Sequence, residues 1–151
     1  MKLELPNSIF FAEVERLLGQ GQCVTIPVKG HSMRPMMHNE RDKVTLTPCN
    51  EEQIEVGAVV LFRHHNGHIM HRICAIDGEK VTFAGDGNYR TKEQAERKDI
   101  VAKVVSITRL SGQVIKLDSA RWRIYSALWL STPAIVRRYI LAITFRLKIW
   151  I

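Results

Sequence analysis

The sequence is poor in cysteine, with Cys23, Cys49 and Cys74 scattered through 151 residues. No C-x-x-C pair is present, and an odd, sparse set of cysteines argues against a disulfide framework. This cysteine usage is typical of proteins that work in a reducing compartment.

Long apolar runs are also missing. Near the N-terminus, Glu13, Glu15 and Arg16 interrupt the apolar residues, so we expect no signal peptide and no N-terminal transmembrane helix. Towards the C-terminus the longest uncharged run is 124–136, with 13 residues, whereas a transmembrane helix needs roughly 20. We therefore expect a cytoplasmic protein, either free or peripheral at the inner membrane surface.

Acidic residues stop at Asp118, and the rest of the chain carries six basic residues: Arg121, Arg123, Arg137, Arg138, Arg146 and Lys148. Of the net charge of +7, these six leave +1 for residues 1–118, so we expect no nucleic-acid-binding face on the body of the protein. Tryptophans 122, 129 and 150 alternate with the basic residues. Two interpretations stay open, namely helices lying on an anionic membrane surface and a helical tail folded back on the domain or on a partner.

Short apolar runs dominate the middle of the chain and predict β-strands. Before them, residues 7–19 carry apolar side chains at helical spacing, with Asn7 as the expected N-cap. The expected strands, rich in β-branched residues, are 23–28, 43–47, 58–64, 68–76, 80–85, 100–108 and 111–117. We therefore predict a mainly-β domain, a coiled or barrel-like sheet, over 1–118 and a basic amphipathic helical tail over 119–151.

Asn66-Gly67 is a strong signal for a two-residue hairpin turn. Such a turn pairs Phe62 with His71 and places both on one largely apolar face of the hairpin. His65 and His68 then flank the turn in solvent, and His68 and His71 point to opposite faces. Together with His64 these histidines are better explained as turn residues than as a zinc site, and we expect neither a metal nor a cofactor.

Five short motifs occur in an order that resembles the signal peptidase I and LexA-like serine peptidase superfamily. They are "GHSMRP" (30–35), "IEVGAVVLF" (54–62), "HRI" (71–73), "GDGN" (85–88) and "DIVAKVV" (99–105). The resemblance implies a LexA/signal-peptidase-like fold, with a nucleophilic serine at the edge of a substrate-binding cleft. Without the other four motifs, a serine in a turn flanked by glycine and proline would be interpreted as structural.

The resemblance also implies a role for each residue that matches a motif. Ser32 falls on the nucleophile, and His71 falls on the base, as in the family members that use histidine instead of lysine. Asp86 falls on the aspartate of the Gly-Asp-x-Asn motif. Ala58 replaces a family aspartate, and the further acid that completes the triad in histidine-type relatives is missing from "YRTKEQAE" (89–96). Either Asp86 is therefore expected to orient His71, or Asp86 only braces the turn, and Glu93, the nearest acid there, or no acid orients the ring.

We accordingly expect a serine endopeptidase that cleaves a leader, signal-like or precursor peptide after a small residue. Its partners would be a peptide or protein substrate and, through residues 119–151, a membrane surface. One alternative is a self-cleaving LexA-like regulator, although no Ala-Gly or Cys-Gly pair precedes Ser32. The other is a catalytically inactive module that binds peptides or membranes.

Overall fold

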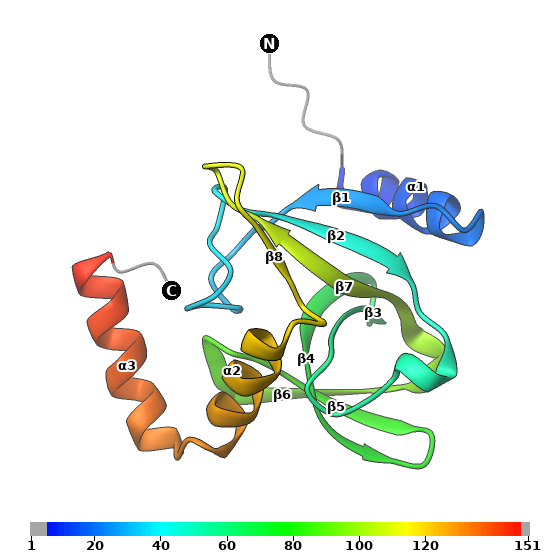
Figure 1. Cartoon of the computed structure of the whole chain (residues 1–151). Coiled ribbons are helices and arrows are strands. Elements are labelled where there is room, and N and C mark those ends of the chain that lie inside the picture. The colour runs from blue at the N-terminus through cyan, green and yellow to red at the C-terminus, as the bar shows by residue number, and fades with distance from the viewer. Residues whose placement is uncertain (1–5, 149–151) are drawn as a thin grey trace.

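The structure, a computed structural model, describes residues 6–148. It is mainly β, with one helix before the strands and two after them (Figure 1). The helices are α1 (Asn7–Gly19), α2 (Ala120–Ser131) and α3 (Ala134–Leu147). The strands are β1 (Val24–Pro27), β2 (Lys43–Pro48), β3 (Val59–His64), β4 (Gly67–Asp77), β5 (Lys80–Gly85), β6 (Asn88–Glu96), β7 (Ile100–Thr108) and β8 (Val114–Lys116).

The strands form one eight-stranded sheet in the order β1-β2-β7-β3-β4-β5-β6, and β8 pairs with β7. Every pairing is antiparallel. The sheet curls on itself, and α2 lies beside it (Figure 1). The predicted mainly-β architecture and the helix over 7–19 are thus confirmed, although Pro6 occupies the N-cap position and no side chain caps the helix, so the expected Asn7 cap is wrong.

Strand β3 separates two apolar clusters because both of its faces are buried. Val59 and Leu61 face a cluster that also holds Met33, Met37 and residues of α1, β1, β2 and β7. The other face packs against β4 and β5, where the Phe62 and Phe83 rings stack with their centroids 3.8 Å apart. The two clusters therefore fix the position of the loop before β2, which carries Ser32, relative to the β3–β4 hairpin, which carries His71.

The β3–β4 hairpin forms, but two residues out of the predicted register. His64 pairs with Gly67 and Val60 with His71, so the turn residues are His65 and Asn66. His65 takes the positive φ of 51° at the turn, and Gly67 enters the strand instead. A shift of two residues preserves which side chains share a face, so His71 still lies on the predicted apolar face, 5% exposed.

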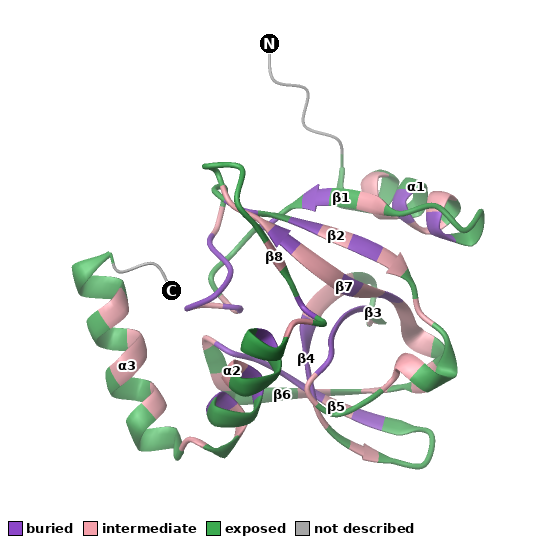
Figure 2. Cartoon of the chain, in the orientation of Figure 1, coloured by how far each residue is buried: buried purple, intermediate pink, exposed green. Residues whose placement is uncertain are grey.

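The tail divides into two helices with different surroundings. Helix α2 is folded back on the sheet, with Trp122, Ser126 and Trp129 buried, whereas no residue of α3 is buried (Figure 2). Trp150, which also contributed to the membrane interpretation, lies outside the described residues. Across residues 6–148, none of the helices has the length and hydropathy to cross a membrane.

Candidate active site

The loop that carries Ser32 connects β1 to β2 and is anchored by its methionines. Met33 is 3% exposed and Met37 is fully buried, so the residue after Ser32 points into the core. Gly30 makes the turn before the serine at a φ of +85°, and its N–H donates to the Asn39 Oδ1 at 2.7 Å. Ser32 itself is only partly buried and lines a small pocket. The loop therefore presents the serine at the surface while its neighbours fix the backbone.

The carbonyl of Ser32 is held against the "GDGN" turn between β5 and β6. The Gly87 N–H donates to the Ser32 carbonyl oxygen at 2.8 Å. A Cβ atom at position 87 would lie 2.6 Å from the carbonyl oxygen of His31, so only glycine allows the two segments to approach this closely. This explains physically why one glycine of the motif is needed.

Gly85 brings Ser32 and His71 to the same point. A Cβ atom at position 85 would lie 2.3 Å from the Ser32 carbonyl oxygen and 3.0 Å from the His71 Nε2. The missing side chain thus makes room for both the serine loop and the imidazole ring. The structure therefore brings together Ser32 and His71, although 39 positions of sequence separate them.

Glu93, not Asp86, is the carboxylate that contacts His71. The His71 Nδ1 lies 2.8 Å from the Glu93 Oε2, and both side chains are largely buried, at 6% and 12% exposed. A carboxylate accepts hydrogen bonds, so in the neutral ring Nδ1 carries the proton. Nε2 is then left as an acceptor on the side of Gly85 and Ser32.

Asp86 binds Arg72 instead. The Arg72 Nε and Nη2 donate to the two carboxylate oxygens of Asp86, each at 2.7 Å, and both side chains are buried. The Tyr125 hydroxyl donates to the Asp86 Oδ2 at 3.2 Å. Of the two acids left open by the sequence, the structure thus places Glu93 against His71 and Asp86 against Arg72.

Arg72, on β4, binds residues of α2 and so links this helix to the sheet. Besides Asp86, its guanidinium donates from Nη1 to the Ser126 Oγ at 2.6 Å and to the Gly57 carbonyl at 2.9 Å, and it lies against the Trp122 ring. Burial disfavours the charged form of Arg72, but the Asp86 carboxylate outweighs this, and the pKa of Arg72 is raised. Burial, with Asp86 adding to it, raises the pKa of Tyr125 in turn. Sequence reasoning missed this role because arginine is rarely buried.

A pocket of about 180 Å³ adjoins Ser32. It lies between the serine loop and the start of β4, and its lining is Val28, Lys29, Gly30, Ser32, Met33, His68, Ile69 and Met70. β5 pairs with β4 only from Arg72 onwards, so Gly67–His71 have a paired strand on the β3 side alone. An extended peptide therefore finds both a small pocket and a strand edge beside the serine.

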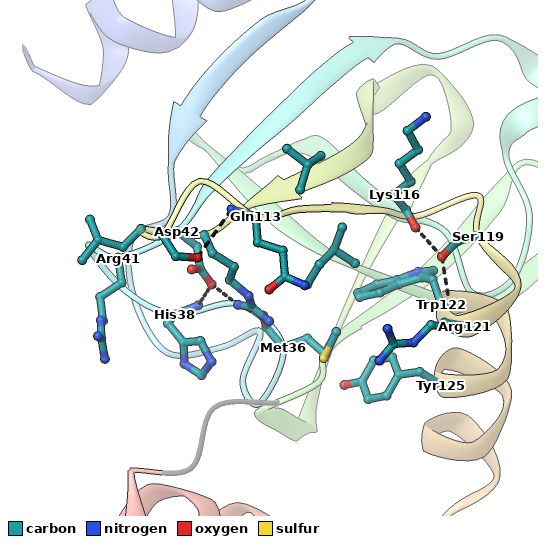
Figure 3. Close-up of a pocket in the computed structure, with 15 residues that line it drawn as sticks. Met36, His38, Arg41, Asp42, Gln113, Lys116, Ser119, Arg121, Trp122 and Tyr125 are labelled. Atoms are coloured by element: carbon teal, nitrogen blue, oxygen red, sulfur yellow. Dashed lines mark hydrogen bonds and ion pairs between the residues drawn. The ribbon is translucent and has the colours of Figure 1, made fainter.

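A larger pocket, of about 760 Å³, lies between the second half of the β1–β2 loop, the β7–β8 hairpin and α2 (Figure 3). Its Ser119 acts as the N-cap of α2, accepting from the Trp122 N–H and donating to the Lys116 carbonyl (Figure 3). Burial lowers the pKa of His38, which lines the same pocket, to about 4. Of the two serines that line this pocket, Ser119 caps the helix and Ser111 is exposed, and the lowered pKa of His38 disfavours its protonation, so this pocket is a weaker candidate than the site at Ser32.

The other hairpin histidines are only partly as predicted. His65 is exposed, but His68 stacks on Phe11 of α1 at 4.6 Å and lies 2.5 Å from the Glu15 Oε1. The expectation that His68 is a solvated turn residue is wrong, because α1 covers this end of the hairpin. Between residues 6 and 148, no three His, Cys, Asp or Glu side chains are grouped so that they could hold a metal ion.

Comparison with known proteins finds no family model that matches this chain and no curated protein whose sequence matches it. The site therefore has to be interpreted from its own geometry. A partly exposed serine lies beside a buried histidine, and that histidine is hydrogen-bonded to a carboxylate on its far nitrogen. This arrangement of residue types can activate a hydroxyl group for nucleophilic attack.

Proposed function

We propose that this protein is a serine endopeptidase similar to the LexA-like and signal peptidase I enzymes, with Ser32 as nucleophile, His71 as base and Glu93 as the orienting acid. The observation that carries the proposal is the position of the His71 ring. Its Nδ1 is bound to Glu93. Its Nε2 lies 3.0 Å from where a Cβ atom at position 85 would be, and the Ser32 carbonyl oxygen lies 2.3 Å from the same point.

In the proposed reaction, the Ser32 Oγ attacks the carbonyl carbon of a peptide bond and passes its proton to the His71 Nε2. Backbone N–H groups, the Ser32 amide first among them, stabilise the oxyanion. His71 then protonates the leaving amine as the C–N bond breaks, which leaves an acyl ester on Ser32. Water, deprotonated by His71, hydrolyses the ester and regenerates the serine. Glu93 stabilises the protonated ring in both halves of the reaction.

Asp86 acts in this proposal as a positioning residue. It adjoins Gly85 in sequence, and Arg72 adjoins His71. Their buried bidentate pair therefore fixes the two backbone segments on which the catalytic geometry depends. The catalytic function predicted for Asp86 from the sequence motif is thus replaced by a supporting one.

The substrate would be an extended peptide with a small apolar side chain before the cleaved bond. A pocket of about 180 Å³ has room for such a side chain, and Val28, Met33 and Ile69 give it apolar walls. The free edge of Gly67–His71 supplies the main-chain hydrogen bonds that hold an extended strand. This supports cleavage within a leader or precursor segment that is unfolded when it binds.

A fluorophosphonate probe tests the proposed nucleophile, because it phosphonylates activated serines. The purified protein should be labelled at neutral pH, and Ser32→Ala and His71→Ala should each abolish labelling. Ser111→Ala and His65→Ala are the matched controls, since both side chains are exposed and neither lines the pocket beside Ser32. Labelling that survives Ser32→Ala, or no labelling of the folded wild-type protein, would overturn the proposal.

Intact mass spectrometry of the same samples separates the alternatives. A self-cleaving regulator would lose mass in a Ser32-dependent manner on incubation, whereas the proposed endopeptidase keeps its mass and accepts the probe. A catalytically inactive module would show neither change.

A further inference from the structure

Helix α3 exposes an apolar face to solvent. Ile135, Tyr139 and Ile143 recur every four residues and therefore share one side of the helix, and they are 65%, 64% and 53% exposed. Val136 and Leu147, also exposed, flank them. Figure 1 shows α3 beyond α2 and away from the sheet, and Figure 2 shows exposed and intermediate residues along α3 and no buried one. Scattered apolar residues on a surface need no explanation, but a contiguous set on one helix face does.

The opposite side of α3 is fixed to the rest of the protein. Arg137 donates from Nη2 to the Leu130 carbonyl at 2.7 Å, and its guanidinium lies over the rings of Trp129 and Tyr89. Near the other end of the helix, the Arg34 guanidinium lies 4.6 Å from the centre of the Phe145 ring. These contacts orient the helix, so the exposure of the apolar face follows from how α3 is attached.

The charged residues of α3 and of its C-cap are all positive. Arg138, Arg146 and Lys148 are exposed, and no acidic residue occurs after Asp118. A second copy of α3 packed on this face would bring like charges together, which opposes self-association. An anionic lipid surface instead supplies negative charge for the arginines and an apolar layer for the isoleucines.

We propose that the exposed face of α3 binds the surface of an anionic membrane, with the helix lying parallel to the bilayer. A helix of 14 residues is about 21 Å long, which suits a surface position. Tyr139 has the apolar ring and polar end that favour the headgroup region. The proposal rests on the exposure and charge of α3 and does not depend on the proposed peptidase activity.

Binding would also bring the candidate active site close to the lipid. Arg34, which contacts Phe145 of α3, is two residues after Ser32, and Tyr89, which lies under Arg137, follows the "GDGN" turn. A lipid-bound α3 therefore places the serine loop and the β5–β6 turn behind the helix, about one helix diameter (roughly 10 Å) from the lipid.

Flotation of the full chain with vesicles tests the proposal. One set of vesicles contains equal parts of phosphatidylcholine and phosphatidylglycerol, and the other contains phosphatidylcholine alone. We expect the protein to float with the anionic vesicles and much less with the neutral ones. The combined substitutions Ile135→Ser, Tyr139→Ser and Ile143→Ser should abolish flotation. A matched triple, Val56→Ser, Leu110→Ser and Val114→Ser, replaces equally exposed residues elsewhere and should float as the wild type does.

A second pair of variants tests the charge. Arg138→Gln with Arg146→Gln should weaken binding about 25-fold, about fivefold for each arginine near the surface. Lys80→Gln with Lys98→Gln removes the same charge from exposed positions at the start of β5 and between β6 and β7, and should leave binding near the wild-type value. The substituted side chains are exposed, so equal thermal unfolding midpoints will establish that the variants fold.

Three results would overturn the proposal. The first is no flotation of the wild type, and the second is equal flotation of the wild type and the α3 triple variant. The third is a dimer by light scattering that the α3 triple variant converts to a monomer, without vesicle binding, which would assign the face to a second copy of the chain.

Discussion

His71 and Arg72 are adjacent on β4 and point to opposite faces of the sheet, and the two faces differ in kind. His71 is bound by one carboxylate, that of Glu93, and its other nitrogen faces the partly exposed serine loop. Arg72 is fully buried and its donors are directed at Asp86, Ser126 and Gly57. The His71 ring thus keeps Nε2 available for reaction, whereas the Arg72 guanidinium donates to three different residues.

The "GDGN" turn serves both faces at once. Gly85 makes room for His71 and Ser32 on one side, and Asp86 binds Arg72 on the other. We therefore expect the contacts of Arg72 to contribute mainly to stability and the contacts of His71 to contribute mainly to reactivity. Substitutions on each side should therefore change different properties, and the following predictions are ordered by the free energy at stake.

Glu93→Gln should slow labelling of Ser32 by a fluorophosphonate about 10²- to 10⁴-fold, under the proposed function. The glutamine amide can donate to Nδ1, which leaves the proton on Nε2 and removes the acceptor that Ser32 needs. Labelling rates measured at neutral pH check this, with Glu79→Gln, an exposed acid, as the control. Stability should fall by no more than about 1 kcal/mol, because a hydrogen bond is still possible. An unchanged labelling rate would mean that Glu93 does not orient a catalytic base.

Asp86→Ala should lower the free energy of unfolding by about 3–5 kcal/mol, because it leaves the Arg72 charge buried without its carboxylate. Urea titration followed by tryptophan fluorescence will measure it, since Trp122 and Trp129 are buried in the same region. Asp77→Ala removes an exposed aspartate from the end of β4 and should change stability by less than about 0.5 kcal/mol.

Adding Arg72→Met to Asp86→Ala should restore part of the stability lost by Asp86→Ala alone. A neutral side chain of similar length removes the unpaired charge, and replacing a buried ion pair by apolar groups is often close to neutral. If the double variant is less stable than Asp86→Ala, the bonds of Arg72 to Ser126 and Gly57 outweigh the cost of its charge.

Gly85→Ala should lower both the stability of the protein and the reactivity of Ser32. Its Cβ would lie 2.3 Å from a backbone oxygen, which cannot rotate away, so the serine loop has to shift. We expect a loss of about 1–3 kcal/mol in stability, typical of overpacking, together with loss of probe labelling. Gly67→Ala is the matched control on β4, where a Cβ meets nothing within 4 Å. If Gly85→Ala keeps wild-type labelling, the close approach of Ser32 and His71 is not needed.

Much of the fold was predictable because its signals are local. The apolar spacing of 7–19 predicted α1, and β-branched runs predicted every strand except β6. Alternation along the hairpin placed His71 on an apolar face, as the structure confirms, although the positive φ of His65 moved the register by two residues.

The candidate site was less predictable because its contacts depend on tertiary structure. Strand β6, "NYRTKEQAE", has no apolar alternation, since it lies at the sheet edge and is largely exposed. The motifs left Glu93 as one candidate acid, but without that strand they did not show that Glu93 reaches across β5 to His71. Arg72 was missed for the opposite reason, since a buried arginine is revealed only by its partners.

Substitution of Glu15 on α1 should have the smallest effect on stability. It also tests whether residues outside β4 influence the reactivity of Ser32. Glu15 binds Arg63 and His68, and chiefly the Arg63 guanidinium lowers the pKa of the Glu15 carboxyl to about 2 from an ordinary value of 4.5. A carboxyl whose pKa is depressed on folding stabilises the protein above its unfolded pKa, and this contribution disappears as the pH falls from about 4.5 to about 2. Glu15→Gln should therefore cost up to about 1 kcal/mol at pH 7, since Arg63 is half exposed, and should cost nothing at the acid end. Urea midpoints across this pH range will measure it, with Glu52→Gln, an exposed acid, as the control. Probe labelling of Ser32 at neutral pH should not change, and a large loss of labelling would extend the reactive side of the molecule to α1.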